Sequence, residues 1–130
     1  MNINDIYGAY NWKTKENEIL ATTANVLESY ERELFKISGN NVHKLSTNPI
    51  NGTLSTIWHI PNRFYLIGGG GIYNKINLNE TLWKGEHFEI TPYYTYRIKG
   101  DNFNNIAATG GAGEVVIFNG VRWKSFINYT

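Results

Sequence analysis

The sequence contains no cysteine, one methionine and three prolines in 130 residues. Without cysteine, the chain has no disulfide, no thiolate metal ligand and no cysteine nucleophile. It also lacks an excess of one charge, because 12 Lys and Arg stand against 11 Asp and Glu, a formal net charge of +1. Proteins that bind nucleic acid usually carry a clustered excess of Lys and Arg. We therefore expect no nucleic-acid partner.

Long apolar runs are missing as well. No segment reaches the roughly 18 apolar residues that a membrane-spanning helix needs, so we expect no membrane insertion. The first five residues, Met-Asn-Ile-Asn-Asp, have neither the basic nor the apolar part of a signal peptide. A secretion signal would therefore belong to a longer precursor. The histidines, at positions 43, 59 and 87, are too dispersed for a metal-ligand motif, so we expect no metal and no other cofactor.

Residues that favour strands and turns are abundant. Aromatic residues make up 15% of the chain, which also has 13 glycines and 18 asparagines but only six alanines. Alanine and methionine favour helices, whereas aromatic and β-branched residues suit pleated sheets. Short β-rich runs separated by glycine and asparagine turns predict an all-β fold, with residues 1–130 as one module.

Three segments of the sequence align with one another. An asparagine opens each segment and an aromatic residue closes it, at Asn17 and Phe35, Asn62 and Trp83, and Asn104 and Trp123. The asparagines lie 45 and 42 residues apart, and the aromatic residues lie 48 and 40 apart. Both spacings are close to the ~40–45 residues of a four-stranded propeller blade. We therefore predict about three blades, at approximately residues 1–48, 49–90 and 91–130.

Each repeat divides into four short predicted strands. In the third repeat they cover residues 94–99, 105–109, 114–118 and 121–126, with the Asn119-Gly120 hairpin signal between the last two. The second repeat gives residues 54–60, 64–68, 71–75 and 81–84. The first gives residues 3–12, 19–23, 25–30 and 33–37, and residues 43–52 and 87–92 are expected to connect the blades.

The third repeat resembles the blades of secreted bacterial β-propellers of the assembly-factor-like or BNR-like kind. Those blades run Asn-Asp-Ile-x-x-x-Gly-x-x-Gly-x-Ile-x-x-x-Asn-Gly-x-x-Trp, and residues 104–123 follow this order from Asn104 to Trp123. The Asn-Gly-x-x-Trp ending is also similar to a degraded sialidase Asp-box, but the Ser and Asp of that box are missing from all three repeats. The resemblance implies a binding role in the extracellular space or periplasm of a bacterium. It carries over no catalytic residues.

Three blades do not close a ring, since propellers have 4–8. Either the chain belongs to a longer protein or copies complete the ring together, most simply as a six-bladed dimer with twofold symmetry. A β-trefoil, which also has three repeats of four strands, is the alternative fold. The Gln-x-Trp signature of ricin-type trefoils is absent from the sequence.

The four consecutive glycines, residues 68–71, are followed by Ile-Tyr-Asn. A phosphate-binding loop would instead lead into a helix, usually with Lys-Ser or Lys-Thr. We therefore predict a tight turn or bulge at this point.

Candidate ligand-binding residues are exposed aromatic residues and their polar neighbours. Trp12 and Trp58 lie near predicted first strands and have no counterpart in the third repeat, and His59 follows on the same strand. Residues 93–97 concentrate tyrosine beside an arginine, and both types are enriched in interface hot spots. The predicted ligand-binding residues are Trp12, Trp58, His59, Tyr93, Tyr94, Tyr96 and Arg97. Alternation along a strand predicts Tyr94 and Tyr96 on one face and Arg97 on the other.

These observations predict a non-enzymatic module that binds protein, in particular its own copy. A carbohydrate-binding lectin that uses the same aromatic residues is the alternative. A glycosidase would need two carboxylates about 5–9.5 Å apart. The only aspartates, Asp5 and Asp101, lie at the edges of corresponding predicted strands, which the turn preference of aspartate also explains.

Overall fold

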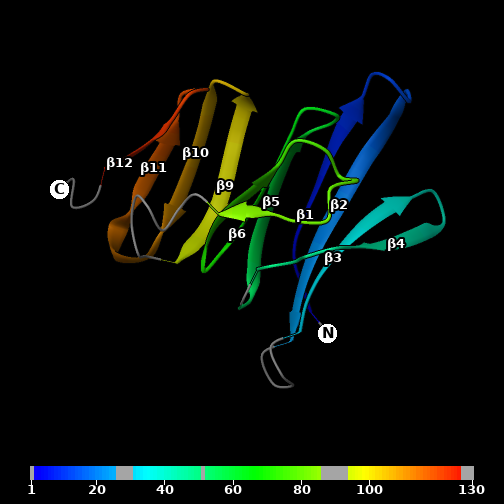
Figure 1. Ribbon diagram of the computed structural model, residues 1–130, viewed down its shortest axis with the longest axis horizontal. Helices are drawn as coiled ribbons and strands as arrows, with labels where there is room; N and C mark the ends of the chain where they lie inside the picture. Colours follow the sequence, from blue (N-terminus) through cyan, green and yellow to red (C-terminus); the bar gives the residue numbers. More distant parts are fainter. Residues whose placement is uncertain (1, 26–30, 51, 86–93, 127–130) are drawn as a thin grey trace.

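The computed structural model describes residues 2–25, 31–50, 52–85 and 94–126, which form three four-stranded antiparallel sheets in chain order (Figure 1). The first sheet contains β1 (Asn2–Asn11), β2 (Glu16–Asn25), β3 (Glu31–Ser38) and β4 (Asn41–Leu45). The second contains β5 (Leu54–Ile60), β6 (Phe64–Gly69), β7 (Gly71–Lys75) and β8 (Lys84–Gly85). The third contains β9 (Thr95–Asn102), β10 (Asn105–Gly110), β11 (Val115–Phe118) and β12 (Trp123–Ser125), with the short 3₁₀ turn η2 (Gly111–Gly113). The predicted all-β fold is confirmed.

The predicted strands agree best in the second and third repeats. In the first repeat, the segment predicted as the fourth strand, residues 33–37, lies on the third strand, β3. The true fourth strand, β4, overlaps residues 43–52, which were expected to be a connection. The predicted strand at residues 25–30 lies outside the described residues, apart from Asn25 at the end of β2. The sequence signal for β4 is the turn at Gly39, which separates β3 from β4. The φ of Gly39 is +58°, a value that favours glycine.

Because of this correction, Phe35 no longer supports the alignment of the three repeats. Phe35 lies on the third strand of its sheet, whereas Trp83 immediately precedes the fourth strand of the second sheet and Trp123 begins the fourth strand of the third. The alignment of Phe35 with Trp83 and Trp123 is therefore wrong.

The three sheets lie side by side, with β5 between β1 and β9 (Figure 1). The middle sheet is therefore packed on both faces. One apolar cluster joins it to the first sheet and includes Leu20, Leu34, Ile50, Leu54, Ile57, Tyr65, Ile67 and Trp83. The other joins it to the third sheet and includes Trp58, Phe64, Leu66, Ile72, Ile98, Ile106, Ala108, Val116, Phe118 and Trp123. Alternating side chains of β5 enter opposite clusters, as the period of two along a strand requires.

The first strand of each sheet carries a bulge at the same place. The strand pairing skips one residue there, which is Asn4 in β1, Ser55 in β5 and Tyr96 in β9. The Asn4 amide donates a hydrogen bond to the carbonyl oxygen of Leu54 at 2.6 Å. In the next step, the Ser55 hydroxyl donates to the carbonyl oxygen of Thr95. The contact from the first sheet to the second is thus repeated from the second to the third.

Two glycines opposite these bulges are required by close backbone approach. A Cβ atom on Gly69 would lie 2.1 Å from the carbonyl oxygen of Thr53, and one on Gly110 would lie 2.2 Å from that of Tyr94. Gly69 also pairs with Gly71 across the turn between β6 and β7. The prediction of a tight turn, with no phosphate-binding loop, is confirmed for the run of four glycines.

Candidate functional site

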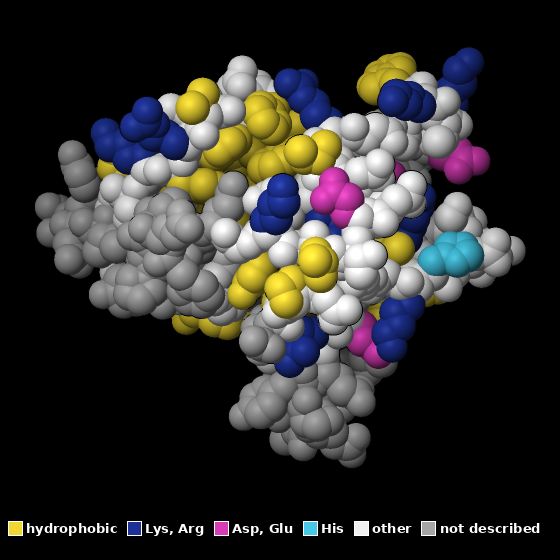
Figure 2. Space-filling view, viewed as in Figure 1, with side chains coloured by type: hydrophobic (Ala, Val, Ile, Leu, Met, Phe, Trp, Pro, Cys, Tyr) yellow, Lys and Arg dark blue, Asp and Glu magenta, His cyan; other side chains and the backbone are white. Residues whose placement is uncertain are grey.

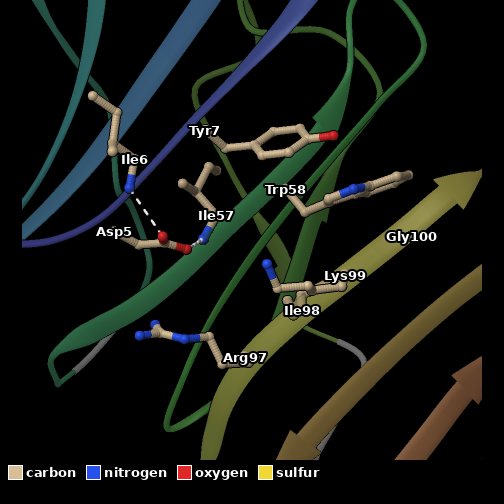
Figure 3. Close-up of a pocket in the computed structure, with 9 residues that line it drawn as sticks. All are labelled: Asp5, Ile6, Tyr7, Ile57, Trp58, Arg97, Ile98, Lys99 and Gly100. Atoms are coloured by element: carbon tan, nitrogen blue, oxygen red, sulfur yellow. Dashed lines mark hydrogen bonds between the residues drawn. The ribbon is translucent and has the colours of Figure 1, made fainter.

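A groove of about 430 Å³ lies where the first strands of the three sheets meet (Figure 3). The residues that line the groove come from β1, β5 and β9. They lie at corresponding positions of these strands when each strand is counted from its bulge. The lining residues are Asp5, Ile6 and Tyr7 of β1, Ile57 and Trp58 of β5, and Arg97, Ile98, Lys99 and Gly100 of β9. The groove brings together two of the predicted residues, Trp58 and Arg97.

Trp58 forms a buried wall of this groove. Its indole lies against Gly100, where a Cβ atom would come within 2.9 Å of Cζ2 of the ring. The ring of Tyr7 lies 6.4 Å away, measured between ring centroids (Figure 3). The indole Nε1 is buried and has no hydrogen-bond acceptor among the described residues. Such a buried, unpaired donor costs about 1–3 kcal/mol of stability.

One oxygen of the Asp5 carboxylate joins the first sheet to the second, and the other bonds within β1. Its Oδ1 accepts from the backbone N–H of Ile6 at 3.0 Å. Its Oδ2 accepts from the Thr56 hydroxyl at 3.0 Å and from the backbone N–H of Ile57 at 2.9 Å. The Thr56 hydroxyl oxygen in turn accepts from the backbone N–H of Ile98 at 3.1 Å. One chain of hydrogen bonds therefore runs through all three sheets.

The other aspartate lies elsewhere. Asp101 is close to the end of β9, where it accepts a hydrogen bond from the Asn105 amide at 3.1 Å, whereas Asp5 lies near the start of β1. The expectation that Asp5 and Asp101 hold corresponding positions is therefore wrong. Counted from the bulges, Asp5 corresponds to Arg97, and Asp101 lies four residues further along β9.

Two cations line the groove at its third strand. Arg97 and Lys99 are both exposed, and neither forms an ion pair within the part of the chain that the structure describes. The Arg97 guanidinium donates two long hydrogen bonds, to the carbonyl oxygen of Ser55 at 3.3 Å and to that of Tyr96 at 3.5 Å. The space-filling view shows apolar side chains over the upper part of the molecule, flanked by Lys and Arg (Figure 2).

His59, another predicted ligand residue, lies between the first and second sheets and is 1% exposed. Its Nδ1 lies 3.2 Å from Oε1 of Glu18, and its Nε2 lies 3.2 Å from the carbonyl oxygen of Tyr7. Its ring stacks on Tyr65, with centroids 5.5 Å apart. Nε2 therefore has a protein partner, and Nδ1 lies within ion-pair distance of Glu18 but makes no hydrogen bond of good geometry among the described residues.

Glu18 and Tyr65 complete this buried network. The Tyr65 hydroxyl donates to Oε1 of Glu18 at 2.8 Å. Burial alone would raise the pKa of Glu18, but its contacts with His59 and Tyr65, with the charges of His59 and Lys36, lower it below its usual value. Burial and the neighbouring carboxylate raise the pKa of Tyr65. The network therefore holds Glu18 charged and Tyr65 neutral near pH 7.

A second buried charge lies near the same sheet interface. Lys75 is almost fully buried, and its Nζ lies 4.6 Å from the ring centroid of Trp83. Burial lowers the pKa of Lys75, although the charge of Glu80 opposes the change. Nζ of Lys75 has no hydrogen-bond acceptor among the described residues, so its cation–π contact with Trp83 stabilises it within the core.

The remaining predicted residues lie at two separate places. Trp12 follows β1 and is 82% exposed, with its ring 4.6 Å from that of Tyr10. Tyr94 and Tyr96 lie near the other end of the first strands, with ring centroids 5.3 Å apart, and the Tyr94 hydroxyl is 2.7 Å from that of Thr53. Tyr93 lies outside the described residues. The structure therefore does not bring Trp12 together with the tyrosine cluster.

The bulge also changes which side chains of β9 are exposed. Tyr96 and Arg97 are both exposed, while Thr95 and Ile98 are buried. The prediction that Tyr96 and Arg97 lie on opposite faces of the strand is therefore wrong. The groove residues Asp5, Tyr7 and Lys99 were also missed as a group. They become apparent only when the three first strands are aligned on their bulges, which the strand pairing reveals.

Membrane-spanning helices, metal sites and similarity to known proteins give no further indication of function. None of the described residues forms a helix long and apolar enough to cross a membrane. The same residues contain no group of three His, Asp or Glu side chains arranged to hold a metal ion. Comparison with protein-family models, curated proteins and solved structures finds no match to this chain.

Proposed function

We propose that this chain is a non-enzymatic interaction module of the β-propeller type, in which each sheet is a blade and a second copy covers the open face of the first sheet. The observation that carries the proposal is a difference in exposure at corresponding positions of the first strands. Ile57 in β5 and Ile98 in β9 are 1% and 3% exposed, whereas Ile6 in β1 is 55% exposed.

A second set of positions shows the same difference. Leu54 and Thr95 are 1% and 0% exposed, because each is covered by the preceding sheet, whereas Ile3 is 66% exposed. Val42, on β4, adds a further exposed apolar side chain to this sheet. Large exposed apolar patches generally mark interaction sites. The first sheet therefore has the side chains of a covered blade but no preceding blade within the described residues.

Charge complementarity supports a second copy as the occupant. Asp5 of the first sheet reaches Thr56 and Ile57 of the second, and Thr56 reaches Ile98 of the third. Arg97 holds the position in β9 that Asp5 holds in β1 and Thr56 in β5. If the third sheet contacts the first sheet of another copy in the same way, Arg97 would lie beside Asp5 of that copy. Two such interfaces would join two chains into a closed ring with twofold symmetry.

The fold supports this assignment over a trefoil. Each repeat forms its own four-stranded sheet, and successive sheets stack through the same contacts. A blade cannot bury both of its faces alone and needs neighbours on each side. The resemblance of the third repeat to secreted bacterial propellers supports an extracellular or periplasmic location, and blades of a longer chain are the alternative occupant of the open face.

Replacing Ile3 with lysine is expected to weaken self-association. Burying an isoleucine contributes about 1.5–3 kcal/mol, so Ile3→Lys should raise the dissociation constant at least about tenfold. Sedimentation equilibrium of the purified chain over a range of concentrations measures this constant. Ile76→Lys is the matched control, because Ile76 is 62% exposed but follows β7, away from the open face. A wild-type chain that stays monomeric at every concentration would contradict the proposal.

Carbohydrate binding is the second candidate function, and the exposed pair of Trp12 and Tyr10 favours it. The two rings meet edge to face, with an interplanar angle of 73°, and the face of the exposed Trp12 ring is a surface on which a sugar ring can stack. On a glycan array, we expect any saturable sugar binding to be lost in Trp12→Ala and kept in Tyr96→Ala. Binding that survives Trp12→Ala would exclude this surface.

A further inference from the structure

We propose that the groove between β1, β5 and β9 binds a small organic acid, with its carboxylate held by Arg97 and Lys99. This proposal is separate from self-association, because the groove lies within one chain and includes neither Ile3 nor Val42. Ile6 and Arg97, however, belong both to the groove and to the proposed contact with a second copy. The ligand is identified by the chemistry of the groove lining.

The charges of the lining favour an anion. Arg97 and Lys99 both line the groove, and neither has an ion-pair partner among the described residues. The one acidic lining residue, Asp5, already accepts three hydrogen bonds from protein groups, as described above. With one carboxylate against two cations, the lining has a net charge of +1. A carboxylate matches the planar guanidinium of arginine and can accept two parallel hydrogen bonds from it.

The remaining lining suits the organic part of such a ligand. The half-buried ring of Tyr7 provides apolar surface beside the cations, whereas Trp58 and Ile57, 3% and 1% exposed, line the groove with almost no exposed surface of their own (Figure 3). The volume of about 430 Å³ falls within the roughly 300–1,000 Å³ typical of small-molecule sites. An inorganic anion would leave this apolar surface uncovered, so the lining favours an organic acid over free phosphate.

The groove is also preorganised. Every lining residue comes from a strand, and the three strands are tied together by the hydrogen-bond chain that begins at Asp5. Gly100 leaves the space that the Trp58 indole occupies, so the wall of the groove is held by packing. The unpaired Nε1 of Trp58 is a further donor without an acceptor at this wall. Sites built on rigid elements lose little binding free energy to ordering.

Benzoate and benzamide provide a matched pair of probes, because they share a ring and differ in charge. In a titration of the isotope-labelled full chain followed by NMR, benzoate should shift the Trp58 indole and Lys99 amide signals saturably, and benzamide should not. Glucuronate and glucose form a second pair, and inorganic phosphate tests the anion alone. Signals of Trp12, which lies outside the groove, should remain unchanged.

Two variants assign the binding to the cations. Arg97→Gln and Lys99→Gln should each raise the benzoate dissociation constant at least about tenfold, because each removes a charged hydrogen-bond donor. Lys84→Gln, an exposed lysine on β8, is the control and should change nothing. Equal shifts with benzamide, unchanged binding in both variants, or binding of phosphate without benzoate would each overturn the proposal. Repeating the titration with Ile3→Lys, which keeps every lining residue, separates this result from any failure of self-association.

Discussion

Replacing Gly69 with alanine is expected to lower the free energy of unfolding by about 3 kcal/mol, at the upper end of typical overpacking costs. The new Cβ would lie 2.1 Å from the carbonyl oxygen of Thr53 and 3.5 Å from Cα of Leu54. Both contacts are to backbone, so no side-chain rotation can relieve them. Relief would require β5 and β6 to separate at the bulge that positions Ser55 against the third sheet. Urea denaturation followed by circular dichroism measures the change.

The neighbouring residue provides a matched control. A Cβ on Gly70 would have no atom within 4 Å, so Gly70→Ala should change stability by less than about 0.5 kcal/mol. Gly110→Ala should behave like Gly69→Ala, because its Cβ would lie 2.2 Å from the carbonyl oxygen of Tyr94. Similar stability of the Gly69 and Gly70 variants would show that the close approach at the bulge does not exist in solution.

Replacing Asp5 with alanine should cost about 3 kcal/mol or more, because hydrogen bonds to a charged group contribute about 1.5–3 kcal/mol each. The change leaves the backbone N–H of Ile57 and the hydroxyl of Thr56 without their acceptor, and both residues are buried. The chain of hydrogen bonds through the three sheets loses its first member. Urea denaturation again measures the loss.

Asp5→Asn tests the charge of the Asp5 side chain, and Asp101→Ala provides a control at an exposed aspartate. Asp5→Asn keeps one oxygen acceptor and should lose less stability than Asp5→Ala. Asp101→Ala is the control, because Asp101 is exposed and accepts a hydrogen bond from the exposed Asn105 amide; its cost should be below about 0.5 kcal/mol. Equal losses for Asp5→Ala and Asp101→Ala would mean that the contact between the first and second sheets is not formed by the carboxylate.

The success of the strand prediction depended on the turns. Asn119-Gly120 predicted the hairpin between β11 and β12, where Gly120 has a φ of +96°. In the first repeat, the turn at Gly39 and Asn40 was overlooked, and β4 was consequently assigned to a connection. Local turn chemistry therefore predicts strand boundaries well where it is recognised, because it depends on neighbouring residues alone.

The candidate site could be predicted only in part. Trp58 and Arg97 were correctly grouped as residues of first strands, and the groove contains both. His59 adjoins Trp58 in the sequence, but its side chain enters the opposite sheet interface, where Glu18 and Tyr65 surround it. The sequence could not reveal these partners, since they lie on other strands and no short motif connects them.

The order of apolar, glycine and asparagine residues was enough to predict an all-β chain of three repeats with four strands each, because strand and turn preferences act over a few neighbouring residues. Tertiary packing alone revealed the bulges, the groove, the buried His59 network and the uncovered face of the first sheet. These features depend on contacts between sheets, whose hydrogen bonds join residues 40 to 52 positions apart. A one-residue bulge changes which side chains face a neighbouring sheet, and its position depends on that neighbour's backbone.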